Sequence, residues 1–187
     1  MLKTGSGTFR IDSQNFYSGR TIVAAGALDV RGSIAQSIVE VKIAGQLIGT
    51  GTVGGIAGFQ DGVVNPGASV GAIQSGSIEL GQKSIIRAEL PAASAGSVYD
   101  QIIVTGTVAM QDAKLELLPA QNTPVGSKFV IIDNDGADPV VGNFAGYPEG
   151  AQFLVNNQRF EITYKGGSGN DIRSEEHTSE LQSQFRI

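Results

Sequence analysis

The chain of 187 residues contains no cysteine, no tryptophan and one histidine, His177. Without cysteine it forms no disulfide, offers no thiolate nucleophile and cannot build the usual structural zinc site. A single histidine excludes every site that needs two, and the sequence has no Gly-x-x-x-x-Gly-Lys phosphate-binding loop. We therefore expect no enzyme that depends on such a site, and no cofactor.

Charge is also scarce, because Asp, Glu, Lys and Arg make up 17% of the chain against about 25% in ordinary domains. The net charge of -5 and the scattered basic residues give no surface for nucleic acid. No apolar run approaches the roughly 18 residues of a membrane span. The first seven residues lack the apolar core of a signal peptide. The sequence thus predicts either an intracellular protein or a fragment of an exported one.

What the chain has in excess is glycine, with 26 residues but without the three-residue period of collagen. Short runs between the glycines alternate apolar and polar side chains, as half-buried strands do. They occupy residues 9–12, 39–43, 77–80, 86–90, 114–117 and 160–165. Residues 102–104 and 129–132 are more fully apolar and β-branched. No twelve-residue segment keeps a period near 3.6, so we predict an all-β protein with essentially no helix.

Similar pieces recur along the chain. The segment GSGTF at residues 5–9 resembles GTGTV at residues 49–53, and TGTV at residues 105–108 resembles both. Loose repetition of short strands and glycine corners favours a β-solenoid, in which each coil stacks on the one before. Such stacking predicts parallel strand pairs, with partners roughly 20–25 residues apart. A β-sandwich, which also needs many short strands, is the alternative.

Three segments in order, LKTGSGTF at residues 2–9, NFYSGRTIV at residues 15–23 and GAL at residues 26–28, resemble the autotransporter-associated β-strand repeat. Residues 47–55, 64–71, 99–106, 129–136, 142–150 and 164–172 resemble later coils of large bacterial surface proteins. The resemblance divides the β-helix into repeat coils at residues 1–96 and distal coils at residues 97–172.

This resemblance implies a right-handed parallel β-helix on a secreted or outer-membrane-associated bacterial protein, held at the membrane by a downstream anchor that this chain lacks. It implies no particular activity, because a fold does not determine a function. We expect a structural stalk or adhesin-type segment without catalysis. Its possible partners are glycans or proteins on host or neighbouring cells.

Residues 173–187 differ from everything before them, because they contain no glycine and their charges crowd into the first eight positions. The string RSEEHTSELQS resembles the in-frame translation of a common short-read sequencing adapter. We therefore exclude this tail from the fold, which also removes the sole histidine. We expect the tail to pack poorly, as a loose extension or an isolated helical turn.

Two segments could bind calcium, which prefers six to eight oxygen ligands. One carries Asp133, Asp135 and Asp138 around a glycine, and its other interpretation is a polar turn after a strand. The second, residues 166–172, fits one copy of a calcium nonapeptide that normally needs neighbouring copies. A calcium-dependent binding module is therefore an alternative function.

A polysaccharide-processing enzyme is the other alternative, because glycoside hydrolysis needs two carboxylates about 5–10 Å apart. The sequence offers Glu79 with Glu89, or Glu40 with Asp61, as pairs on stacked coils. Against it, tryptophan is absent, and several aromatic residues fit inward positions. Those inward aromatic positions include Phe9, Phe129 and Phe160.

The alternation also assigns the two faces of each strand, since a slip of one residue would exchange them. The residues that we expect to be buried are Ile11, Leu28, Val41, Ile78, Leu80, Ile86, Leu115, Leu117, Ile131 and Ile162. Those that we expect to be exposed are Arg10, Glu40, Lys42, Glu79, Arg87, Lys114 and Glu116.

Overall fold

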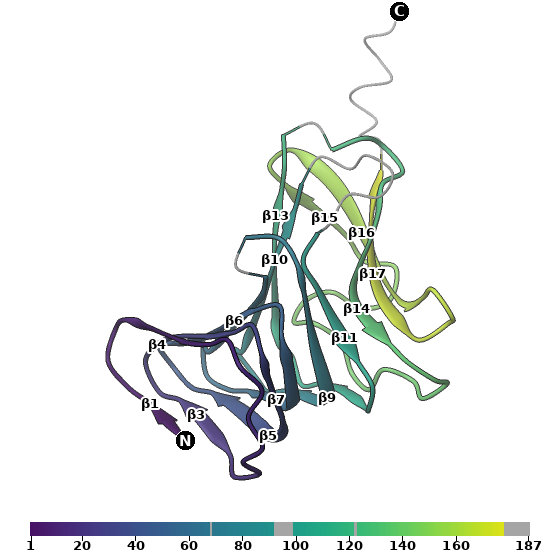
Figure 1. Ribbon diagram of the computed structural model, residues 1–187. Coiled ribbons are helices and arrows are strands. Elements are labelled where there is room, and N and C mark those ends of the chain that lie inside the picture. The colour runs from purple at the N-terminus through teal and green to yellow at the C-terminus, as the bar shows by residue number, and fades with distance from the viewer. Residues whose placement is uncertain (68, 92–98, 122, 178–187) are drawn as a thin grey trace, which may run out of the picture.

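The structure, a computed structural model, describes residues 1–67, 69–91, 99–121 and 123–177. Within these ranges the protein contains seventeen β-strands and no helix. The strands form two sheets, and in Figure 1 they follow one another from the purple N-terminal end toward the green and yellow C-terminal end. The predicted all-β class is thus confirmed.

The larger sheet has eleven strands and the smaller has six. In sheet order, the larger contains β1 (Leu2–Lys3), β3 (Thr21–Val23), β5 (Ser33–Val41), β7 (Thr52–Gly58), β9 (Ala72–Leu80), β11 (Gln101–Val104), β14 (Lys128–Asn134), β17 (Asp171–His177), β16 (Gln158–Gly166) and β15 (Gln152–Val155), and β12 (Val108–Met110) also pairs with β9. The smaller contains β13 (Lys114–Pro119), β10 (Ile85–Leu90), β8 (Val63–Pro66), β6 (Gly45–Gly49), β4 (Gly26–Val30) and β2 (Thr8–Ile11).

From β1 to β10 the chain alternates between the two sheets, so each strand pairs with the strand two further along. Every strand pair among β1 to β14 is parallel. This arrangement is consistent with a β-solenoid. It also excludes antiparallel hairpins across residues 27–118, within the part that the structure describes.

The predicted spacing between paired residues is only partly right. Ile56 pairs with Ile78, which falls within the predicted range, while Leu28 pairs with Leu47 and lies just short of it. Farther on, Ile73 pairs with Ile102, which exceeds the range. The later coils are longer because the segments between their strands are longer, while the ladder itself continues.

Aliphatic columns between the sheets form the core. In the smaller sheet Leu28, Leu47, Val64 and Ile86 lie in register, and each is completely buried. In the larger sheet Val39, Ile56, Ile78 and Val108 form an equivalent column, with at most 1% exposure. Burying each such side chain contributes about 1.5–3 kcal/mol, so the stacked columns are the main source of stability.

Glycine allows the tight corners between coils. Gly49 has a φ of 117°, and its N–H and carbonyl oxygen both bond to Gly67 of the next coil, at 2.9 and 2.8 Å. A Cβ at Gly49 would lie 2.1 Å from the carbonyl oxygen of Val30. Only glycine fits both the left-handed backbone and this close approach.

The predicted faces agree with the structure in most cases. Nine of the ten residues expected in the core are buried, and Leu115 is half-buried. None of the seven charged residues expected outside is buried. The expected inward position of Phe9 is wrong, because this side chain is 49% exposed, while Phe129 and Phe160 are buried as expected. It lies on β2, which ends the smaller sheet and pairs only with β4, so no further described strand covers its ring.

The expectation that the tail packs poorly is also wrong for residues 173–177. These residues belong to β17, which lies between β14 and β16 and pairs antiparallel with both. Ser174 and Glu176 point inward, with 0% and 5% exposure, where a core would take aliphatic side chains. Pairing of the backbone thus holds this segment despite its polar side chains. Leu181 and Phe185, and the rest of the tail after residue 177, lie outside the described residues.

Candidate functional site

A shallow trough lies on the outer face of the larger sheet, over β5, β7 and β9. One outward column across these strands runs through Glu40, Ala57, Glu79 and Ala109 in register. The neighbouring column contains Ile38, Gly55 and Ser77. Because β7 contributes only alanine and glycine to these columns, the surface is lower there than over β5 and β9.

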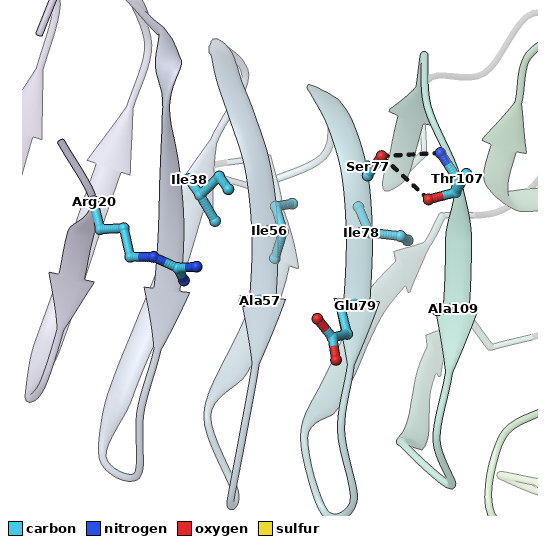
Figure 2. A pocket seen from close by; sticks show the side chains of 9 residues that line it. All are labelled: Arg20, Ile38, Ile56, Ala57, Ser77, Ile78, Glu79, Thr107 and Ala109. Carbon is cyan, nitrogen blue, oxygen red and sulfur yellow. Dashed lines mark hydrogen bonds between the residues drawn. The ribbon is translucent and has the colours of Figure 1, made fainter. Parts of the chain in front are cut away.

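The hollow has a volume of about 220 Å³. Figure 2 shows the side chain of Arg20 at one end and those of Ser77 and Glu79 beyond β7 at the other. Its lining residues are Arg20, Ile38, Ile56, Ala57, Ser77, Ile78, Glu79, Thr107 and Ala109. Aliphatic and polar groups therefore share one small surface.

Two hydroxyl groups are fixed at one wall of the trough. The Ser77 hydroxyl oxygen accepts a hydrogen bond from the backbone N–H of Thr107 at 3.1 Å, and it lies 3.2 Å from the Thr107 hydroxyl (Figure 2). Gly106 makes this contact possible, because a Cβ there would lie 2.5 Å from the Ser77 hydroxyl. The pair is thus held in place from the next coil of the stack.

The charges of the trough are unequally compensated. Glu40 binds Lys42 at 2.9 Å and also contacts Arg20. The hydrogen bond from Lys42, together with that from Arg20, lowers the pKa of Glu40 despite the opposing effect of burial. Glu79 is exposed, and its carboxylate accepts a long hydrogen bond from Gln111 at 3.4 Å. Among the described residues Glu79 forms no ion pair.

The carboxylate pairs proposed from the sequence do not face each other. Glu79 lies on the larger sheet and Glu89 on the smaller. Asp61 lies outside the strands, where it contacts Lys114 at 3.3 Å, away from the column that carries Glu40. Glu40 and Glu79 instead flank Ala57, and their backbones are two strand spacings, or roughly 9.6 Å, apart across the sheet.

The two predicted calcium segments come together at one corner of the structure. The side-chain amide of Asn170 donates to the backbone carbonyls of Asp135 at 3.2 Å and Asp138 at 3.0 Å. Asp171 accepts a hydrogen bond from the backbone N–H of Asn134 at 2.9 Å. Burial raises the pKa of Asp133, and the charges of Asp171 and Asp135 raise it further.

This corner is acidic, and it retains buried oxygens without a hydrogen-bond partner, on Asn134 and Asp138. The carbonyl oxygens, however, converge on an amide nitrogen instead of an empty space. In the described ranges no three carboxylates or imidazoles form a group that could hold a metal ion. Calcium binding by Asp133, Asp135 and Asp138 stays a prediction.

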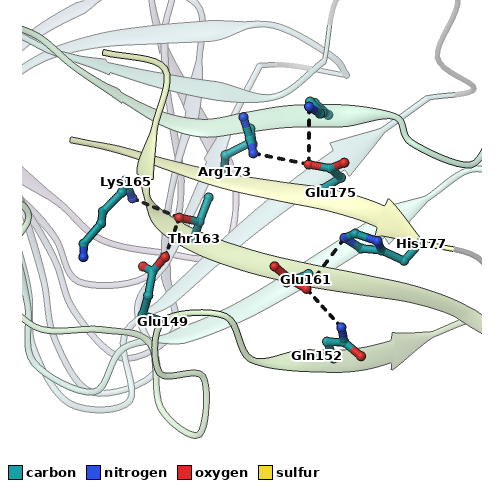
Figure 3. Close-up of polar contacts among 9 residues, drawn as sticks. Glu149, Gln152, Glu161, Thr163, Lys165, Arg173, Glu175 and His177 are labelled. Carbon is teal, nitrogen blue, oxygen red and sulfur yellow. Dashed lines mark hydrogen bonds and ion pairs between the residues drawn. The ribbon is translucent and has the colours of Figure 1, made fainter. Parts of the chain in front are cut away.

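A second polar surface covers the outer face of the antiparallel strands. Figure 3 shows Arg173, Glu175 and His177 of β17 beside Glu161 of β16. Glu175 contacts Arg173 at 3.2 Å, and His177 lies 3.8 Å from Glu161. Because adjacent positive and negative groups neutralise one another here, this surface has no concentrated charge of one sign.

The trough was missed by sequence reasoning. Its signal was the run GGIAG at residues 54–58, which places little side-chain volume on the outer face of a strand.

In the described ranges no helix is long and apolar enough to cross a membrane.

No protein-family model matches the chain. A stretch of 73 residues, 39% of this chain, is 37% identical to an extracellular serine protease of Serratia marcescens. The match corresponds to 7% of that protein's length. Part of this chain is thus similar to a small part of an extracellular bacterial protein.

Proposed function

We propose that the chain is a segment of a right-handed parallel β-helix in an autotransporter-like bacterial surface protein, either secreted or associated with the outer membrane. Its role is that of a rigid stalk. The observation that carries this proposal is the unbroken parallel ladder from β1 to β14 over completely buried columns. The similarity to an extracellular protein and the repeat-like segments near the N-terminus support the location.

Deleting one whole coil tests this architecture. Removal of residues 28–46 brings Leu47 to the position of Leu28, so the columns stay in register. We expect this variant to retain cooperative unfolding and its circular dichroism, and small-angle scattering to show a stack shorter by about 4.8 Å. Removal of residues 33–41, which takes out β5 alone, should instead abolish folding. Equal behaviour of the two deletions would contradict a stacked-coil stalk.

We propose the trough as the adhesive face of the stalk, with neutral glycans of a host or neighbouring cell as its partners. Sugar hydroxyls both donate and accept hydrogen bonds, which suits Ser77 and Thr107, and aliphatic Ile38 suits the apolar face of a sugar ring. Glu79 would accept bonds from hydroxyl groups and repel acidic sugars.

A glycan-array measurement tests this face. Glu79→Gln should weaken retention of neutral glycans about tenfold, since hydrogen bonds to charged groups contribute roughly 1.5–3 kcal/mol. Glu116→Gln, on the smaller sheet, is the matched control and should bind as the unaltered protein does. Binding that is unchanged by Glu79→Gln, or retention of peptides alone, would reject the glycan assignment while leaving the stalk untouched.

We further propose that the segment is not catalytic. Of the two carboxylates that flank Ala57, Glu40 is neutralised by Lys42 and Arg20. A carboxyl group that acts as a general acid or base would instead need surroundings that raise its pKa toward the working pH. Release of reducing ends from any glycan that binds the trough would overturn this proposal and favour a polysaccharide-processing enzyme.

A calcium-dependent binding module is the second candidate, favoured by the meeting of residues 133–138 with residues 166–172 and by the unpaired oxygens there. If calcium binds, a calcium concentration of 100 times Kd should stabilise the fold by about 2.7 kcal/mol. Asp135→Asn should reduce this gain, and Asp112→Asn should not. An unchanged melting temperature with calcium would remove this candidate.

A further inference from the structure

The corner that joins β14 to the antiparallel strands contains the chain's one Asp-Pro bond, between Asp138 and Pro139. Its carbonyl oxygen, on Asp138, accepts two side-chain amide hydrogen bonds. Asn134 donates at 2.9 Å and Asn170 at 3.0 Å. Two side-chain donors aimed at one carbonyl oxygen are the kind of arrangement that stabilises negative charge when it develops on that oxygen.

Both amide donors are held rigidly. Asn134 is 1% exposed and Asn170 is 5% exposed. The Ser168 hydroxyl donates to the amide oxygen of Asn170 at 2.6 Å, which turns the amide nitrogen toward the carbonyls. For Asn134 the opposite orientation would place its oxygen against the carbonyl oxygen of Asp138. The two amides are therefore oriented toward this carbonyl before any reaction begins.

A carboxylate oxygen of Asp138 is the candidate nucleophile for a reaction with its own backbone. The Oδ2 atom of Asp138 is buried and has no hydrogen-bond partner among the described residues. Such an oxygen has lost its hydration without gaining a compensating bond, so no hydrogen bond has to be broken before it attacks. Attack on its own carbonyl carbon would close a five-membered ring, and an intramolecular attack of this kind gains a large effective concentration.

We propose that the chain cleaves itself between Asp138 and Pro139. A carboxyl oxygen of Asp138 forms a bond to the carbonyl carbon of the same residue, and the negative charge that develops on the carbonyl oxygen is stabilised by Asn134 and Asn170. The bond to the Pro139 nitrogen then breaks, and that nitrogen takes the carboxyl proton. One water molecule opens the resulting cyclic anhydride, which leaves Asp138 with two carboxyl groups and Pro139 with a free amino terminus.

Cleavage would not separate the two fragments. Residues 139–187 include β17, which pairs with β14 of the first fragment, and Phe160 and Ile162 of β16 are buried in the common core. The fragments should thus remain one folded particle and separate only on unfolding. This property goes beyond the proposed stalk, since it would make one covalent connection of the stack dispensable.

The test compares folded and unfolded protein at the same pH, because Asp-Pro bonds also break slowly in any acidic chain. Purified protein is incubated at pH 5 and 37 °C in EGTA, with and without 8 M urea, and samples are followed by denaturing electrophoresis and intact mass. We expect fragments 1–138 and 139–187, formed at least ten times faster in the folded protein. Equal or faster cleavage in urea would overturn the proposal.

Variants then identify the groups that act. Asp138→Asn should abolish the folded-state reaction, and Asn134→Ala or Asn170→Ala should each slow it by about tenfold or more. Asn143→Ala removes an amide outside this corner and should cleave as the unaltered protein does. Each variant is first checked for native circular dichroism, and the comparison with urea needs no variant. Unchanged rates in both Asn134→Ala and Asn170→Ala would also overturn the proposal.

Discussion

The parallel stack from β1 to β14 and the antiparallel end from β14 to β17 meet in one sheet but are built differently. In the stack, every strand pairs with a strand one coil away, and the inward positions repeat aliphatic residues such as Leu28 and Leu47. In the antiparallel end, β15 pairs with β16 and β16 with β17, which are neighbours in the sequence, and β17 also pairs with β14. There the inward positions of β17 hold Ser174 and Glu176.

The difference shows that backbone pairing and side-chain packing are separate requirements. The backbone of β17 satisfies its hydrogen bonds on both sides, but Ser174 Oγ and one Glu176 carboxylate oxygen are buried without partners among the described residues. Burial raises the pKa of Glu176, and its neighbours only partly oppose this. The stack is thus stabilised mainly by its buried aliphatic side chains, whereas β17 is held mainly by backbone hydrogen bonds.

Leu47→Ala should have the largest effect on stability. Leu47 is completely buried and is in register with Leu28 and Val64, so truncation leaves a cavity in the column. We expect a loss of about 2–5 kcal/mol of unfolding free energy, measured by urea denaturation. Gln46→Ala, one residue earlier on the outer face, is the control and should change the free energy by less than about 0.5 kcal/mol.

Asp100 should make the stack more stable in mild acid. Its carboxylate is completely buried and accepts hydrogen bonds from the backbone of Gly71 at 3.0 Å and Glu89 at 2.9 Å. Burial, partly opposed by these bonds, raises its pKa from 3.8 to about 6. Because the folded pKa lies above the unfolded one, the folded state binds the proton more strongly, and its stability falls as pH rises from about 4 to about 6.

The size of this effect is about 2 kcal/mol between pH 4 and pH 7. Urea denaturation across this range should show it as a difference between the unaltered protein and Asp100→Asn, whose side chain does not titrate. Asp100→Asn also places an N–H group against one backbone donor, so it should be less stable at every pH. If both proteins have the same pH dependence, the assignment to Asp100 is wrong.

Glu176→Leu should stabilise the antiparallel end. It replaces a buried carboxylate that lacks a full set of partners by an aliphatic side chain of similar size, which we expect to raise the unfolding free energy by about 1–3 kcal/mol. Glu175→Gln, on the outward face of the same strand, should have little effect or a small loss. A destabilised Glu176→Leu would mean that the end strand packs differently from the columns.

Deleting residues 173–187 should lower the melting temperature measurably, since it removes most of the strand between β14 and β16. Burial of Ile172 within the core would also be lost in part. A melting temperature that is unchanged by this deletion would show that β17 adds nothing to the fold.

Much of the fold could be predicted from the sequence because alternation states which side chain faces inward. Residues 86–90 and 114–117 alternate, and both form paired strands of the smaller sheet. The length of the later coils could not be predicted, because loop residues carry no period. Phe9 was misplaced because alternation gives the direction of a side chain but not whether a further strand covers it.

The trough and the corner at Asp138 needed the structure. Each depends on residues from different coils, such as Ala57 with Glu79 and Asn134 with Asn170, and no local pattern joins them. The strand at residues 173–177 was missed because the composition of a segment does not show whether two other strands leave room for it between them.

The coils of this stack differ in length, since the step from Ile73 to its partner Ile102 is much longer than the step from Leu28 to Leu47. Lengthening a flexible connection by half costs only about 0.4 kcal/mol of closure entropy, far less than one damaged column. Such a stack can therefore acquire new loops in evolution at almost no thermodynamic cost. The loops that the surface presents can therefore change quickly, while the buried columns beneath them stay constrained.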